Sequence, residues 1–325
     1  MLPPCVRLVF VVVLLAAGCS SAVRPVTRPP GDPLDELRSL IVDVTAATAH
    51  RYRISDDRGR WMDTLKVIAR SETAAFAAVY HAWNDEDQAF HVQLATSTDL
   101  LTWSWVAELA VKASQPTIAA VPGGGYVVAW EQEPDPIHIA IASYPTWEAL
   151  VGATPDKRFD VPVTMPACGE GTPSFESVTP DRIELGFHHH ASCERDLQAS
   201  GTLDWSAGTW QARQERGRDR ALIEAGVAGH IGDRDRIMFR GRDLLLLEGQ
   251  LVLDANGTWR TFLVDEAGHA ERLAFRTDAS SAAFMNPTIG QIRIRGRDAL
   301  VVTLFLPTEG AHGEEDGPLL YYRLL

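Results

Sequence analysis

The sequence has little basic charge, no apolar run long enough to cross a bilayer, and no long stretch of helical periodicity. Its 325 residues include 30 Lys and Arg against 43 Asp and Glu, a net charge of −13, which argues against nucleic acid or an anionic membrane surface as the main partner. The apolar run Leu8–Ala17 has about half of the roughly 20 residues that a transmembrane helix needs. After residue 60, short apolar runs alternate with turn residues, which is typical of an all-β protein.

The N-terminus has the composition of a secretion signal. Arg7 supplies a short basic region, and the apolar run that follows it has the length of a signal-peptide core. The run ends in L-A-A-G-C-S-S at residues 15–21, which resembles the bacterial lipobox, whose cysteine is acylated and becomes the mature N-terminus. We therefore expect a lipoprotein signal peptide over residues 1–18 and a lipid on Cys19. An ordinary signal sequence followed by a chance cysteine is the alternative.

The segment after the lipobox predicts a tether. Residues 19–33 are rich in proline and should stay extended between the lipid and the folded domain. We expect an extracytoplasmic, monomeric lipoprotein of the cell envelope, with the lipid anchor as its only link to the membrane and with no nucleic-acid partner.

Only four cysteines are present, and their positions predict one disulfide. Cys5 leaves with the signal peptide and Cys19 takes the lipid, so Cys168 and Cys193 remain. Two cysteines in an oxidising compartment most simply pair. Metal ligation by this pair is the alternative, although neither residue belongs to a C-x-x-C motif.

A hairpin of two apolar runs around a short turn recurs five times. Its turns begin at residues 71, 122, 179, 241 and 295, and a third candidate strand follows each hairpin. The hairpins occupy residues 64–81, 117–131, 174–189, 236–248 and 288–305. Repeats of about 50–60 residues with three or four strands each predict a five-bladed β-propeller. A two-sheet sandwich would not explain five similar hairpins at one period. We expect the propeller to span residues 34–325, with residues 34–58 closing the ring.

Three segments after the hairpins share an Asp–turn–Trp pattern, at residues 97–103, 204–210 and 254–259. In such a cap the carboxylate accepts hydrogen bonds from turn amides while the indole covers the hydrophobic edge of the sheet. We expect these caps to be structural.

Propeller geometry predicts where a ligand would bind. The start of each first strand and the end of each second strand lie on the same face, around the central channel. At the starts of four first strands the polar candidates are Gln115, Thr172, His230 and Asn286. At the ends of the second strands the charged or ionisable candidates are Glu131, Glu133, His188 and Glu248. One polar group per blade suits a sugar ligand, whereas the alternative is that these side chains tie neighbouring blades together.

Three consecutive histidines, His188 to His190, are a candidate metal-binding feature. Because successive strand residues face opposite sides, at most two of them point inward. Without suitably spaced carboxylates we expect no metal site and no cofactor, although a channel-bound ion such as calcium is an alternative.

Three motifs together resemble the five-bladed propeller glycosidases of glycoside hydrolase family 43 and its relatives: S-T-D-L-L-T-W at residues 97–103, the hairpin from S-Q-P-T to A-W-E-Q-E at 114–133, and E-G-T-P-S at 170–174. The resemblance covers roughly residues 60–325. It implies inverting hydrolysis by a general acid and a general base. The best match for the acid is Glu170, with Asp63 or Glu131 activating water and Trp61 stacking on a sugar ring.

The sequence departs from the family at two of three catalytic places. S-Q-P-T in the second repeat has no carboxylate, and the Asp-Pro expected in the first repeat is missing. We therefore predict a carbohydrate-recognising, glycosidase-like propeller with a glycan or oligosaccharide as its ligand. A non-catalytic propeller that serves as a binding or assembly module of the cell envelope is the alternative.

Overall fold

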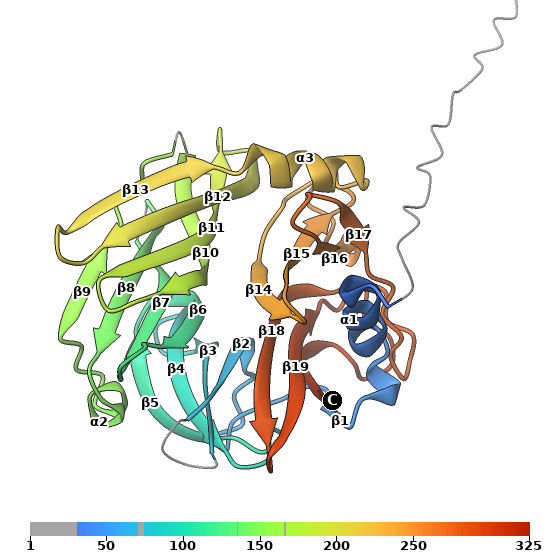
Figure 1. Cartoon of the computed structure of the whole chain (residues 1–325), viewed down its shortest axis with the longest axis horizontal. Coiled ribbons are helices and arrows are strands. Elements are labelled where there is room, and N and C mark those ends of the chain that lie inside the picture. Colours follow the sequence, from blue (N-terminus) through green and yellow to red (C-terminus); the bar gives the residue numbers. More distant parts are fainter. Residues whose placement is uncertain (1–30, 71–74, 135, 166) are drawn as a thin grey trace, which may run out of the picture. The chain divides into compact units, whose positions relative to one another are not determined.

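The computed structural model describes residues 31–70, 75–134, 136–165 and 167–325. The predicted signal peptide and the lipidation site Cys19 lie outside these residues. In the described part of the chain, twenty strands form five four-stranded antiparallel sheets, arranged as the blades of a propeller around a central channel (Figure 1). The predicted fold class, an all-β five-bladed β-propeller, is confirmed.

The first three blades follow the chain in order. Blade one contains β2 (Asp63–Ala69), β3 (Phe76–Asn84), β4 (Ala89–Ser97) and β5 (Ser104–Ala110). Blade two contains β6 (Ala113–Ala120), β7 (Tyr126–Gln132), β8 (His138–Tyr144) and β9 (Lys157–Asp160). Blade three contains β10 (Ala167–Val178), β11 (Arg182–Ala191), β12 (Arg195–Asp204) and β13 (Thr209–Gln214).

The last blade joins the two ends of the domain. Blade four contains β14 (Arg234–Phe239), β15 (Arg242–Gln250), β16 (Trp259–Val264) and β17 (Ala270–Arg272). Blade five contains β18 (Met285–Ile294), β19 (Arg297–Leu306), β20 (Gly317–Leu324) and β1 (Ala49–Arg51). Since β1 pairs antiparallel with β20, from Ala49 opposite Tyr322 to Arg51 opposite Leu320, an early segment supplies the outermost strand of the last sheet.

Apolar strands form because each blade is covered on both faces by its neighbours. In β3, every residue from Phe76 to Ala82 is buried. Within the described residues, five hydrophobic clusters lie between successive blades. The cluster between blades four and five also receives Leu34, Leu37 and Ile41 from helix α1 (Pro33–Ile41), which therefore covers that junction.

Short helices connect strands elsewhere. Helix α2 (Trp147–Val151) lies between β8 and β9, α3 (Arg216–Glu224) leads from blade three to blade four, and the 3₁₀ helices η1 (Val44–Ala46) and η2 (Asn256–Thr258) precede β1 and β16. Of the described helices, none combines the length and apolar character needed to cross a membrane.

Two of the three predicted Asp–Trp caps form as expected. Asp99 accepts hydrogen bonds from the amides of Leu101 and Thr102, and Asp204 accepts one from Ala207. The third cap differs, because the Asp254 carboxylate contacts Nε2 of His230 at 3.2 Å instead of accepting hydrogen bonds from the amides of its own turn.

The predicted disulfide is confirmed. Cys168 and Cys193 are bonded, with their Cα atoms 5.4 Å apart. The bond joins the start of β10 to the turn between β11 and β12, next to the histidines at the end of β11.

Candidate active site at the channel mouth

The first strands of four blades begin with the same local distortion. Thr64, Gln115, Thr172 and Asn286 each adopt a left-handed backbone conformation, with φ between +47° and +50°. Strand register shifts at each of these places, as it does at a β-bulge. The bulges turn the chain around the end of the channel that we call the mouth, where first strands begin and second strands end.

Blade four places a different residue in this ring from the one the sequence predicts. Asp233, not His230, lines the channel together with Thr64, Gln115 and Thr172. The prediction was displaced by three residues because blade four lacks the proline used for alignment. The cavity inside the ring has a volume of only about 20 Å³, room for about one water molecule. Lys66 and Asp235 form an ion pair within its lining, so a ligand has to bind above it.

The ring residues bond to one another across blade boundaries. The Thr64 hydroxyl donates to the Gln115 side chain at 2.6 Å, and the Asn286 amide donates to Thr64 and Asp63 at 3.1 and 3.2 Å. The Thr172 hydroxyl bonds to Nδ1 of His188 at 2.6 Å. The contacts of Thr64 with Gln115 and Asn286 are the inter-blade ties of the alternative interpretation, whereas Thr172 and His188 both belong to blade three.

Second-strand side chains add a further set of ties. The backbone N–H of Gln115 donates to Nδ1 of His81 at 3.0 Å, and that of Thr172 donates to Glu131 at 2.9 Å. Glu248 accepts hydrogen bonds from the N–H groups of Asp233 and Asn286. For Gln115, Thr172 and Asn286, a side chain of the preceding blade therefore satisfies a backbone donor at the bulge, whereas Asp233 and Glu248 belong to the same blade.

Two glycines make room for these carboxylates. A Cβ atom on Gly171 would lie 2.1 Å from Glu131 Oε2, and one on Gly232 would lie 2.2 Å from Glu248 Oε1. Both acidic groups therefore occupy space that a side chain at these positions would fill.

Four carboxylates, from Asp63, Glu131, Asp233 and Glu248, meet at the mouth. Burial raises the pKa of Asp233 well above its usual range, and the charges of Glu248, Glu131 and Asp63 raise it further. Neither oxygen of Asp233 has a partner within normal hydrogen-bond geometry among the described residues, although the nearby Thr172 side chain lowers its pKa and so opposes the rise. Perturbed, unpaired carboxyl groups of this kind concentrate at functional sites.

The pKa of Glu248 lies close to neutral pH. Burial raises its pKa to about 7, the two backbone donors oppose the rise, and the charges of Asp196 and Asp63 contribute to it. A carboxyl group with this pKa can donate a proton in the pH range where most proteins work.

Asp63 is held in one orientation. His81 accepts the Gln115 amide at Nδ1, so its proton lies on Nε2, which is 3.3 Å from Asp63 Oδ2. The N–H of Thr64 and the side chain of Asn286 donate to Oδ1. The Asp63 side chain remains 19% exposed, so a water or a ligand can reach it.

The predicted acid Glu170 does not belong to this set. It precedes Gly171 in β10, and adjacent strand residues project to opposite faces. Its Oε1 atom accepts hydrogen bonds from the amides of Thr164 and Met165 at 2.9 and 2.8 Å, and the side chain is buried. Burial raises the pKa of Glu170, but its carboxylate is used to bind the backbone of the loop that contains Thr164 and Met165.

Two histidines and an aspartate form a second cluster on the rim of the mouth. Asp196 lies 2.8 Å from Nδ1 of His190 and 2.9 Å from Nδ1 of His230. His188 links the two clusters, since its Nδ1 contacts Thr172 and its Nε2 lies 3.7 Å from Asp196. The predicted ligand residue His230 therefore belongs to the rim.

Two exposed tryptophans are close to the site residues in sequence. Trp61 is 44% exposed and Trp83 is 47% exposed, and each lies within two residues of Asp63 or His81. Exposed indoles at the edge of a polar site offer the apolar surface on which sugar rings stack.

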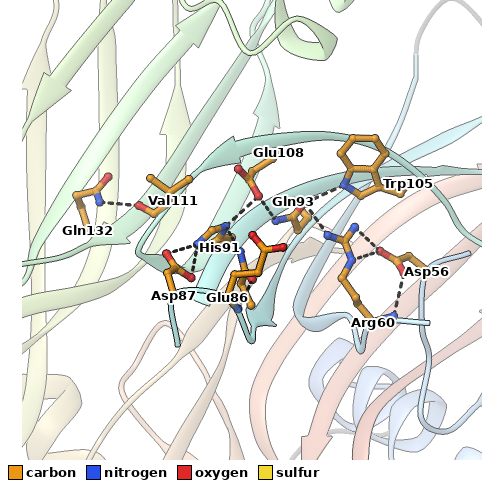
Figure 2. A network of polar contacts seen from close by, with 11 residues as sticks. Asp56, Arg60, Glu86, Asp87, His91, Gln93, Trp105, Glu108, Val111 and Gln132 are labelled. Carbon is orange, nitrogen blue, oxygen red and sulfur yellow. Dashed lines mark hydrogen bonds and ion pairs between the residues drawn. The ribbon is translucent and has the colours of Figure 1, made fainter. Parts of the chain in front are cut away.

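Glu133 lies away from the channel. It lines a separate cavity of about 600 Å³ with Glu108, Gln132 and other residues of blades one and two. Figure 2 shows the polar network beside this cavity, in which Glu108 bonds to His91 at 2.9 Å and to Gln93 at 3.2 Å. The hydrogen bonds of that network are satisfied within the protein.

Solved structures similar to this one include glycoside hydrolases. An exo-1,5-α-L-arabinanase from a bovine ruminal metagenomic library is 11% identical over 84% of this chain and 96% of its own, with a TM-score of 0.53. The catalytic domain of a Coprinopsis cinerea family 62 α-L-arabinofuranosidase is 12% identical over 84% and 95%, with a TM-score of 0.53. A family 43 endo-arabinanase from Bacillus licheniformis is 10% identical over 85% and 97%, with a TM-score of 0.51. At these identities the similarity establishes the fold.

No protein-family model and no curated protein matches the sequence. The glycosidase-like five-bladed propeller therefore rests on the structure and its structural neighbours.

Sequence reasoning missed Asp233 and Asp196. A signal for Asp233 exists, since G-T-P-S at residues 171–174 and G-D-R-D at 232–235 align on their glycines, the two positions that make room for Glu131 and Glu248. Asp196 has no such signal, because its role depends on partners from other strands.

Proposed function

We propose that the protein binds a glycan at the channel mouth and hydrolyses a glycosidic bond there. The observation that carries the proposal is the convergence of four carboxylates from blades one, two and four on one mouth, with the pKa of Glu248 close to neutral pH. Hydrolysis of a glycosidic bond needs one carboxyl group that donates a proton and one carboxylate that acts as a base or nucleophile. The glycosidases that share the fold make this chemistry the first to test.

Glu248 is the proposed proton donor. The proton on its raised-pKa carboxyl would pass to the glycosidic oxygen as the bond to the departing sugar breaks. Asp233 lies beside Glu248, and burial together with the Glu248 charge raises the pKa of Asp233 well above its usual range. This assignment replaces Glu170.

Asp63 is the proposed base. It is oriented by His81, Asn286 and the Thr64 amide, and it is partly open to solvent. Trp61, two residues before it, supplies a stacking surface that would hold a sugar ring beside this carboxylate.

The test is a screen of the soluble fragment from residue 32 against aryl glycosides and a glycan array. We expect turnover of at least one glycoside, reduced 10²–10⁴-fold in Glu248→Gln with glycan binding retained. Glu224→Gln, at the exposed end of α3, is the matched control and should keep full activity. Failure to hydrolyse any glycoside would contradict the catalytic proposal.

A non-catalytic glycan-binding propeller is the second candidate. One observation favours it: Glu131 and Glu248 both accept backbone hydrogen bonds from a neighbouring blade, which is a structural use of a carboxylate. Glycan binding with no turnover in either wild type or Glu248→Gln would select this candidate.

We also propose that the propeller is displayed outside the cytoplasm on a lipid attached to Cys19. The lipobox-like residues 15–21 support this anchor, and the Cys168–Cys193 bond is of the kind that persists in oxidising compartments. Mass spectrometry of the mature N-terminal peptide should find an acylated Cys19, and Cys19→Ser should release the protein from the membrane fraction. An unmodified mature N-terminus at another residue would contradict the proposal.

A further inference from the structure

The rim cluster of His190, Asp196 and His230 has the composition of a transition-metal site. Their ligand atoms lie within 4.8 Å of one another. The three residues come from separate segments: the end of β11, the start of β12 and the connection that leads to β14. Two imidazoles and one carboxylate form a donor set that suits zinc and related divalent ions, whereas calcium prefers six to eight oxygen ligands.

The two groups that face Nδ1 of His230 ask for opposite hydrogen-bonding roles of this nitrogen. Its Nδ1 atom faces both the backbone N–H of Asp196 at 3.1 Å and the carboxylate of Asp196 at 2.9 Å. One ring nitrogen cannot accept from the amide and donate to the carboxylate in the same state. A metal ion between Nδ1 and the carboxylate oxygen would be attracted by both groups, and it would take the Nδ1 lone pair in place of the Asp196 N–H.

Partners outside the cluster orient its ligands. Nε2 of His230 lies 3.2 Å from Asp254, the carboxylate–histidine arrangement that usually supports a ligating imidazole. His188 brings a third imidazole nitrogen to 3.7 Å from Asp196. Three protein ligands leave a coordination position open, and His188 lies beside the cluster on the side toward the mouth.

We propose that His190, Asp196 and His230 bind one divalent transition-metal ion of the zinc class at the rim between blades three and four. The ion would fasten the β11–β12 turn to the chain segment that enters blade four. This proposal is independent of glycoside hydrolysis, and it departs from the expectation, drawn from the sequence, that no metal site is present.

Isothermal titration with zinc chloride tests the proposal on untagged, chelator-treated protein from residue 32. We expect one ion per chain with a dissociation constant of 1 μM or lower, and a loss of at least 100-fold in His190→Ala and in His230→Ala. Asp254→Asn should weaken binding about tenfold. His269→Ala removes a histidine that also faces an aspartate, Asp265 at 3.1 Å, but lies outside the cluster, and should leave binding unchanged.

Cobalt(II) gives a readout that does not depend on variants. The wild-type protein should show the visible absorption bands of a low-symmetry nitrogen- and oxygen-ligated cobalt site, and zinc should displace them. The proposal is overturned if zinc binds more weakly than 100 μM, or if the two ligand variants, folded by circular dichroism, bind it as tightly as wild type.

Discussion

Each acidic residue at the mouth has its own environment, although the four lie close together. Asp63 receives three donors and remains partly exposed, Glu131 accepts one backbone amide, and Asp233 has no partner on either oxygen among the described residues. Glu248 accepts two amides and still carries a raised pKa, because burial outweighs these donors. Different environments separate the protonation states of neighbouring carboxyl groups, which is how one site can supply both an acid and a base.

The raised pKa of Glu248 predicts how stability depends on pH. Its folded-state pKa of about 7 exceeds the usual glutamate value of 4.5, so between these pH values the folded protein holds a proton that the unfolded chain has lost. The free energy of unfolding should therefore fall as pH rises from about 4.5 to about 7, by on the order of 2 kcal/mol from this group.

Urea titrations at pH 4.5 and 7 measure this effect. Glu248→Gln should remove that part of the pH dependence and leave the fall of the same sign that comes from the raised pKa of Asp233, while Glu224→Gln should behave as wild type. If Glu248→Gln and wild type lose stability equally over this range, Glu248 is not protonated in the folded state.

At the scale of elements, β10 and β11 connect the ring at the mouth with the rim cluster. They carry Thr172, His188 and His190, and the Cys168–Cys193 bond closes the end of this hairpin region. The two cysteines are 25 residues apart in sequence, which in a chain-entropy model corresponds to a stabilisation of about 3 kcal/mol.

Removing the disulfide should therefore lower stability and loosen the rim. We expect Cys168→Ser/Cys193→Ser to lose about 3 kcal/mol of the free energy of unfolding in chemical denaturation. The rate of glycoside turnover should fall less in this double variant than in Glu248→Gln, because the four mouth carboxylates lie in blades one, two and four and the disulfide lies in blade three. A double variant with unchanged unfolding would show that the bond adds nothing to stability.

The N-terminal elements decide whether the ring closes. Helix α1 buries Leu34, Leu37 and Ile41 against blades four and five, and β1 completes blade five. A fragment that begins at residue 32 should fold, whereas one that begins at residue 58 should lose cooperative unfolding, since it exposes that apolar junction and the edge of β20. Thermal denaturation followed by circular dichroism compares the two; equal melting temperatures would contradict the role of α1 and β1.

For the whole molecule, the sequence predicts the fold better than the site. Five hairpins at one period, with turns at residues 71, 122, 179, 241 and 295, determine the propeller because local apolar runs and turn residues are sufficient to define each blade. The site depends on which side chains meet across blades. Gln115, Thr172 and Asn286 do lie at the mouth. The alignment on proline misplaced the residue of blade four. In E-G-T-P-S one more residue separates the glutamate from the proline than in the family motif, and a shift of one residue turns a strand side chain to the opposite face, so Glu170 does not join the mouth carboxylates.

The central claim is that the mouth carboxylates surround a scissile glycosidic bond. The most direct measurement is a crystal structure of the Glu248→Gln protein with an oligosaccharide selected by the glycan screen. We predict a sugar ring on Trp61, with a glycosidic oxygen within hydrogen-bond distance of residue 248 and a water or anomeric carbon facing Asp63. An oligosaccharide bound instead in the cavity lined by Glu108 and Glu133, with the mouth empty, would contradict the account.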